Sequence, residues 1–127
     1  MRLPVFLLAF ILLHLTPLQA QHYRIAFWNV ENLYDTINDP AVNDEEFLPG
    51  AKNAWTSARY MTKLNNLSDI ILDMNEGNGP SIIGMAEVEN RKVLEDLTTK
   101  TKLKKQKYGI VHHNSRDKRG IDVALIY

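Results

Sequence analysis

The first apolar block of the chain predicts a β-strand, and a long polar stretch follows it. Residues 23–28 are rich in aromatic and β-favouring residues and include four successive apolar positions, Ile25 to Trp28. Such a run is typical of a central strand that is covered on both faces. Residues 35–53 are acidic and rich in turn-forming residues, so they predict a long loop.

The next block has the periodicity of a helix. Between residues 55 and 77, apolar side chains recur at steps of three and four, namely Tyr60, Leu64, Leu67, Ile71 and Met74. This spacing predicts an amphipathic helix of about twenty residues. Thr56 or Ser57 can cap its start, and Gly77 can supply the left-handed residue at its end.

The remaining pattern predicts an α/β fold. Residues 82–88 form a second buried strand, and a strand, a helix and a strand in this order indicate a parallel crossover. Asn90 is placed to cap a short helix that follows. Residues 108–112 and 122–127 predict two further strands, separated by a polar loop.

The first twenty residues have the pattern of a secretory leader. A basic Arg2 precedes an apolar stretch from Val5 to Leu18, and the small Ala20 is followed by polar residues. This predicts a signal peptide over residues 1–20 and an exported domain over residues 21–127. The alternative is a membrane anchor, but the stretch is shorter than the roughly 20 residues that span a bilayer. The chain has no cysteine, so export brings no disulfide.

The charges divide the chain into an acidic part and a basic part. Residues 21–90 carry four basic and eleven acidic side chains, whereas residues 91–127 carry ten basic and four acidic ones. The basic run from Lys100 to Lys107 is explained either by a solvated helix face or by attraction of a polyanion. Charge alone does not decide between these two interpretations.

Polar residues at the ends of the first two strands are candidates for chemistry. Parallel strands present ligand-binding residues beyond their carboxyl ends, so Asn29, Glu31 and Glu87 are expected at one rim. Their hard oxygen atoms suit Mg²⁺, Mn²⁺ or Ca²⁺ better than zinc. Asn29 alone is also explained by backbone hydrogen bonding, and Glu31 and Glu89 by solvation. Glu87 borders apolar strand, where an unpaired charge is costly, so it needs a cation nearby.

These motifs together carry a resemblance to a known superfamily. WNVEN after the first strand, IIGMAEVEN at the end of the second, and RGIDVALIY near residue 127 resemble the amino-terminal half of the endonuclease/exonuclease/phosphatase (DNase I-like) superfamily. The resemblance covers residues 23–127. It implies half of a four-layer αββα sandwich, with one mixed β-sheet flanked by helices.

The resemblance also implies roles for individual residues. Glu87 matches the glutamate that binds the catalytic divalent ion, usually Mg²⁺, and Asn29 matches the asparagine that supports the metal and phosphate site. Glu31 matches a second metal neighbour. Asp122 matches a polar residue that supports the catalytic histidine, and Arg119 is placed to face substrate phosphate.

The implied function is hydrolysis of phosphate esters. We expect an exported divalent-metal-dependent phosphoesterase of nuclease type, with nucleic acid or another phosphate ester as its substrate. The alternatives are a phosphatase that acts on lipid or inositol phosphates and a non-catalytic secreted binding module. The superfamily's later aspartate–asparagine and aspartate–histidine pairs do not occur in these 127 residues. We therefore expect a truncated form with little or no catalysis by itself.

Overall fold

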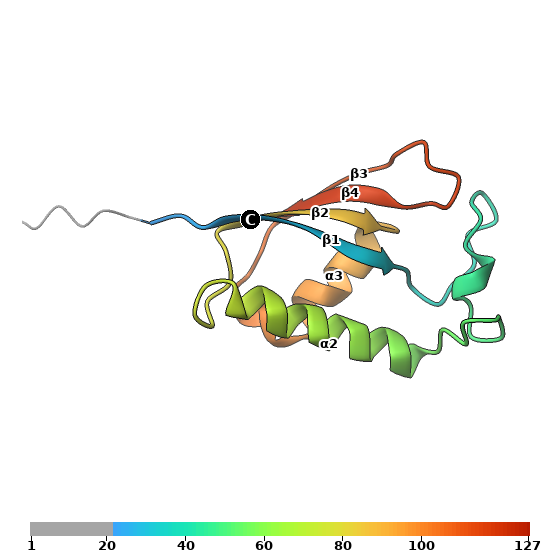
Figure 1. Ribbon diagram of the computed structural model, residues 1–127, viewed down its shortest axis with the longest axis horizontal. Helices are drawn as coiled ribbons and strands as arrows, with labels where there is room; N and C mark the ends of the chain where they lie inside the picture. Colours follow the sequence, from blue (N-terminus) through green and yellow to red (C-terminus); the bar gives the residue numbers. More distant parts are fainter. Residues whose placement is uncertain (1–21) are drawn as a thin grey trace, which may run out of the picture.

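The computed structural model describes residues 22–127, so the predicted signal peptide lies outside the described residues. These residues form two α-helices, four strands and two short 3₁₀ helices (Figure 1). The elements in order are β1 (Ile25–Leu33), η1 (Glu45–Phe47), α2 (Ser57–Asp73), β2 (Ile82–Val88), α3 (Arg91–Lys100), η2 (Lys102–Lys105), β3 (Ile110–His113) and β4 (Asp122–Ile126). Among these elements, no helix is long and apolar enough to cross a membrane.

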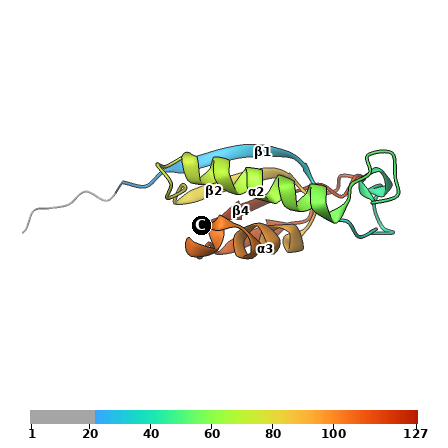
Figure 2. The same cartoon turned by 90° about the horizontal axis from the view of Figure 1, so that it is seen from below.

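The strands form one mixed sheet in the order β1-β2-β4-β3. β1 and β2 pair in parallel, while β4 pairs antiparallel with both β2 and β3. Both helices lie side by side on the same face of the sheet (Figure 2). This confirms the predicted α/β class, with one β layer and one α layer, as in half of a four-layer sandwich.

Helix α2 is the crossover between the two parallel strands, and its ends match the predicted signals. The side-chain oxygen of Thr56 accepts a hydrogen bond from the Arg59 amide, which caps the first turn. Gly77, at a φ of 87°, turns the chain back after the helix, and its amide donates to the Leu72 carbonyl. Asn90 caps α3 in the same way as Thr56 caps α2, by accepting from the Val93 amide at 3.0 Å.

The core lies between the helices and one face of the sheet. Side chains with no exposed surface come from β1, α2, β2, α3, η2 and β4, including Leu33, Leu64, Ile71, Ile83, Met85, Leu94, Leu103 and Ile126. The alternation of side chains along each strand sends every second residue to this core. The periodic apolar positions of the sequence therefore identify most of the buried face.

The prediction that the first strand is central and covered on both faces is wrong for the described residues. β1 is an edge strand, and its Ile25 and Phe27 side chains are 73% and 74% exposed. They share an uncovered sheet face with Val111, Val123 and Tyr127, which are also exposed. An apolar run predicts burial but does not specify the partner, and no described element covers this face.

The basic run lies far from the carboxyl ends of the parallel strands. Lys102 pairs with Asp69 of α2 at 2.8 Å, and the Tyr108 hydroxyl donates to the Pro80 carbonyl, just before β2 begins. The run is thus near the amino end of β2, about 20 Å along the strand from Glu87. A solvated surface explains these lysines better than attraction of a polyanion to that rim.

The loop after β1 is held by aromatic packing and by a buried carboxyl group. Tyr34 stacks on Phe47 with ring centroids 4.1 Å apart, and the Trp55 indole donates to the Tyr34 carbonyl. Glu89 is only 7% exposed and accepts the Asp35 amide at 2.6 Å. Interpretation of Glu89 as a solvated acid is therefore wrong. Burial raises the pKa of Glu89 to about 7, and the nearby acidic side chains add to this increase.

The packing of α2 predicts a stability difference between two of its residues. Leu64 has no exposed surface, whereas Ile70 on the same helix is 46% exposed. Leu64→Ala should lower the free energy of unfolding by about 2–5 kcal/mol, and Ile70→Ala by less than about 1 kcal/mol. Urea unfolding followed by circular dichroism measures both. Equal losses would contradict the assignment of this helix face to the core.

The buried Glu89 predicts that stability depends on pH. Its pKa is about 7 when folded and ordinary, near 4.5, when unfolded, so the folded state binds more protons between these values. The stabilisation is complete below about pH 4.5 and is lost as the pH rises towards 7. From pH 5 to 8, wild type should lose about 2–3 kcal/mol relative to Glu89→Gln.

Urea unfolding at both pH values measures this difference. The control is Glu45→Gln, which removes an exposed carboxyl group from the loop after β1. Its stability should depend on pH as that of wild type does. A constant difference between wild type and Glu89→Gln across the pH range would show that Glu89 titrates normally.

Candidate functional site

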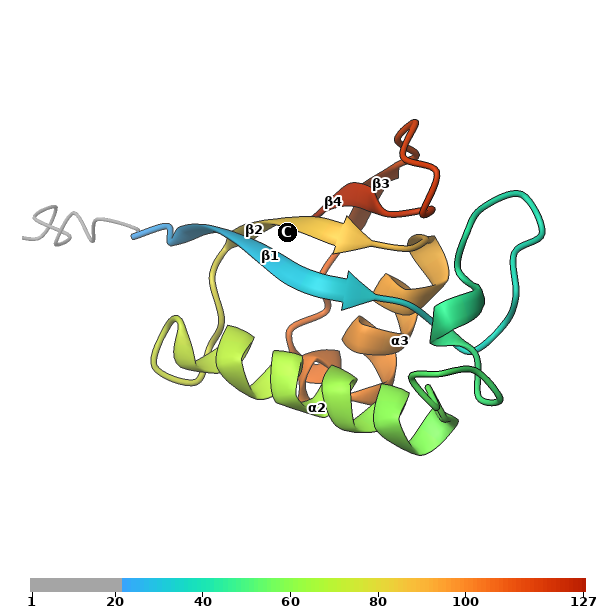
Figure 3. The ribbon, with the colours of Figure 1, turned by 45° about the vertical axis from the view of Figure 1, so that its right-hand side comes forward.

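The parallel pairing brings the polar ends of β1 and β2 together. Asn29 lies beside Ala86 in the register, so its neighbour across the strands is one residue before Glu87. Figure 3 shows both strands pointing towards the same end of the molecule, where the long loop after β1 begins. This end is where parallel sheets place their ligands.

The backbone at this end has an unusual conformation in both strands. Glu31, Asn32 and Glu87 have φ values of 57°, 60° and 62°, which non-glycine residues rarely adopt. The register between β1 and β2 shifts between Asn29 and Leu33. Left-handed residues of this kind cost of order 1 kcal/mol each and often occur at functional sites.

One hydrogen bond within β1 and one between the two strands hold this conformation. The Asn29 side-chain oxygen accepts the Glu31 amide at 2.8 Å. The Asn32 amide donates to Glu87 Oε2 at 3.1 Å, which fixes the half-buried carboxylate. The left-handed conformation of Asn32 and the orientation of the Glu87 side chain therefore stabilise each other.

Lys63 of α2 binds the same turn from the other side. Its Nζ donates to the Glu31 carbonyl, and it lies 3.4 Å from the Asn32 carbonyl oxygen. Burial lowers the pKa of Lys63, while the charges of Glu31 and Glu87 oppose that change. Helical periodicity marks Lys63 only as a polar position, so the sequence does not predict this contact.

Four of the five predicted site residues line one shallow pocket. Asn29, Glu87, Arg119 and Asp122 border a cavity of about 520 Å³ at the carboxyl end of β2. Glu31 is exposed and does not line it. The structure therefore brings the ends of β1 and β2 close to the β3–β4 loop. Glu31 contacts its neighbours at this end through its backbone amide and carbonyl groups.

Asp122 is a buried acid with fixed neighbours. It is 8% exposed, and its Oδ1 accepts the Ser115 amide at 2.7 Å. Oδ2 lies 2.9 Å from His112 Nε2, without the alignment of a hydrogen bond. The contact is an ion pair only when the imidazole is protonated. His112 lies on β3, and its side chain is buried against Asp122.

Arg119 is oriented by its own loop. Its guanidinium group binds Asp117 through two contacts, at 2.8 and 3.1 Å, and holds the pKa of that carboxyl group below its ordinary value. The Tyr34 hydroxyl donates to the Arg119 carbonyl at 2.7 Å. Burial raises the pKa of Tyr34 to about 12, so this hydroxyl remains a donor at neutral pH. The charged group of Arg119 faces solvent at the pocket rim.

The donors in this pocket fit an ion of the magnesium type. Within residues 22–127, no three His, Cys, Asp or Glu side chains form a group that could hold a metal. The oxygen donors of Glu87 and Asn29 remain, and only one oxygen of Glu87 accepts a hydrogen bond within the described chain. Magnesium commonly binds through one or two carboxylates and keeps several waters, so a sparse oxygen set is compatible with it.

Comparison with known proteins identifies the family of the chain. No curated protein and no solved structure matches it. The model of the Endonuclease/Exonuclease/phosphatase family matches residues 24–127, which includes all the strands and helices described above and every predicted site residue. The chain therefore belongs to the endonuclease/exonuclease/phosphatase family.

Proposed function

We propose that the chain carries the metal-binding residues of a divalent-metal-dependent phosphodiesterase of nuclease type. Family membership indicates a phosphoesterase-type superfamily whose members are generally dependent on divalent metals. The observation that supports the proposal most is that Asn29 and Glu87 line the same pocket. The two residues lie on different strands, with the whole of α2 between them in the sequence, and the fold brings their oxygen atoms to one end of the sheet.

Glu87 and Asn29 would hold the ion in this pocket. A bound Mg²⁺, or Mn²⁺ or Ca²⁺, would neutralise charge on the phosphoryl oxygens of a substrate. Glu87 would supply the negative charge, with its orientation fixed by the Asn32 amide. Glu31, which is exposed beside Asn29, is proposed as an outer neighbour that adds negative charge.

Arg119 and Asp122 would act on the substrate side of the pocket. Arg119 lies at the rim with its guanidinium group exposed, where it can bind a phosphate oxygen. Asp122 is held by the Ser115 amide and can orient an imidazole, as its contact with His112 illustrates. A general base that activates water is a further requirement of this chemistry.

The substrate class is proposed from the shape and charge of the pocket. The open cavity of about 520 Å³ has two arginines, Arg116 and Arg119, beside three acids in its lining, and it has room for one phosphate group within a longer chain. This favours a polynucleotide over a small inositol phosphate, which is usually enclosed on more sides. The leader pattern of residues 1–20 supports the further proposal that the protein is exported.

The test of the proposed function is the effect of Glu87 on metal binding and hydrolysis. In the protein expressed from its complete open reading frame, Glu87→Gln should weaken Mn²⁺ binding at least about tenfold, because it removes the negative charge of a proposed direct ligand. Mg²⁺-dependent hydrolysis of bis(p-nitrophenyl) phosphate should fall by about 10²-fold or more. Isothermal titration calorimetry and release of nitrophenol measure these two effects.

Glu76→Gln is the matched control, because this glutamate follows α2 at the opposite end and its side chain is 87% exposed. It should leave both measurements unchanged. Equal metal binding in wild type and Glu87→Gln would remove Glu87 from the site. Metal binding without hydrolysis of any phosphate ester would favour a non-catalytic binding module.

A further inference from the structure

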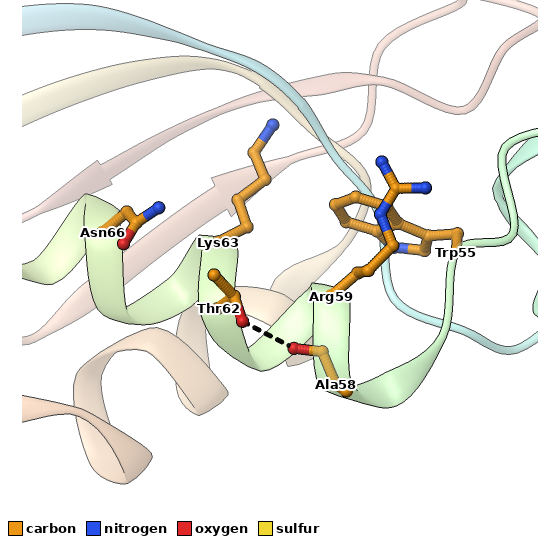
Figure 4. A pocket seen from close by; sticks show the side chains of 6 residues that line it. All are labelled: Trp55, Ala58, Arg59, Thr62, Lys63 and Asn66. Atoms are coloured by element: carbon orange, nitrogen blue, oxygen red, sulfur yellow. Dashed lines mark hydrogen bonds between the residues drawn. The ribbon is translucent and has the colours of Figure 1, made fainter.

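A second pocket lies on the outer face of α2, apart from the pocket of Asn29 and Glu87. Its volume is about 450 Å³, and Figure 4 shows the side chains that line it, namely Trp55, Ala58, Arg59, Thr62, Lys63 and Asn66. Arg59, Lys63 and Asn66 follow one another at steps of four and three, so they form one stripe along the helix. We propose that this stripe binds a backbone phosphate of the polynucleotide substrate, next to the phosphate that is cleaved.

The stripe presents hydrogen-bond donors above an aromatic floor. The Arg59 guanidinium carbon and the Lys63 Nζ lie 5.6 and 5.9 Å from the centre of the Trp55 ring. Arg59 uses one nitrogen to bind the Asn53 carbonyl, which leaves the rest of its fork for a ligand. The Asn66 side chain is exposed on the same stripe and can add an amide donor.

The two cations of the stripe have no ion-pair partner within the described residues, although the charges of Glu31 and Glu87 act on Lys63 from a longer distance. Within residues 22–127, neither Arg59 nor Lys63 forms an ion pair, although Lys92, Lys100 and Lys102 all do. Like charges one turn apart destabilise a helix. Arg59 also lies in the first turn of α2, where the helix dipole disfavours a cation, and that turn contains no acid. An anion bound between these side chains would offset both costs.

The position of the stripe beside the candidate metal pocket indicates which anion it binds. Lys63 contacts the carbonyl groups of Glu31 and Asn32, and the Asn32 amide in turn binds the Glu87 carboxylate. The stripe therefore borders the candidate metal pocket across the end of β1. A polyanion whose reacting phosphate lies at Glu87 can place a neighbouring phosphate here. This inference rests on the proposed function for the identity of the polyanion.

The apolar surface of the pocket fits a nucleotide better than a free phosphate. Trp55 and the aliphatic parts of Arg59 and Lys63 form much of the lining, so a sugar or an unpaired base can pack beside its own phosphate. The proposed ligand is accordingly a flexible nucleic acid strand, bound through charge and surface packing without recognition of sequence.

Binding of an oligonucleotide at several salt concentrations tests the subsite. A fluorescein-labelled thymidine 12-mer is titrated by anisotropy in EDTA, so that no hydrolysis occurs. Arg59→Gln should weaken binding about three- to tenfold and reduce the slope of log affinity against log salt by about 0.7, the value for one phosphate contact on a single strand. Arg59→Lys should keep the slope, because it keeps the charge.

Lys104→Gln is the matched control, because this exposed lysine lies on η2 at the opposite end of the molecule and it too removes one positive charge. It should leave the affinity and the slope unchanged. Equal losses in Arg59→Gln and Lys104→Gln would overturn the subsite in favour of diffuse charge. Equal losses in Arg59→Lys and Arg59→Gln would overturn it in favour of a purely structural contact with Trp55 and Asn53.

The hydrolysis assay separates this inference from the proposed function. Hydrolysis of the small diester that depends on Glu87, with oligonucleotide binding unaffected by Arg59→Gln, would overturn the subsite alone. Oligonucleotide binding that depends on Arg59, in a protein that neither binds Mn²⁺ at Glu87 nor hydrolyses the diester, would overturn the proposed function and retain the anion subsite.

Discussion

The parallel pairing of β1 with β2 is the constraint on which the rest of the structure depends. Asn29 and Glu87 are distant in the sequence, and only this register makes them neighbours at one end of the sheet. The pairing requires a crossover, and the crossover is α2. The helix that covers the sheet therefore also carries Lys63 to the end of β1, so a single topological requirement produces both the core and the surroundings of the pocket.

Backbone strain at the strand ends has a local compensation. Three non-glycine residues in left-handed conformation lie where the two strands meet, and each would be unfavourable alone. The Asn29 side chain, the Glu87 carboxylate and the Lys63 ammonium group each bind the backbone of this segment. Because two of these groups, the side chains of Asn29 and Glu87, also line the pocket, the geometry of the site and the conformation of the backbone are coupled.

Much of the fold follows from the sequence, since apolar spacing and capping residues are local signals. The bounds of β2, the Asn90 cap and the parallel crossover agree with the structure. The position of β1 at the edge does not follow, because an apolar run specifies burial without its partner. Four predicted site residues, Asn29, Glu87, Arg119 and Asp122, line one pocket. The sequence did not predict the contacts of Lys63 or the burial of His112, because both depend on contacts between distant segments.

The indole of Trp55 has a further consequence. The chain contains two tryptophans, and Trp55 is buried with its ring nitrogen bound to the Tyr34 carbonyl and two cations near its face. Nearby charges alter the energy and yield of indole fluorescence, so the fluorescence of Trp55 depends on its surroundings. Replacement of Trp28 by phenylalanine would leave Trp55 as the one tryptophan, whose fluorescence spectrum responds to binding on the outer face of α2.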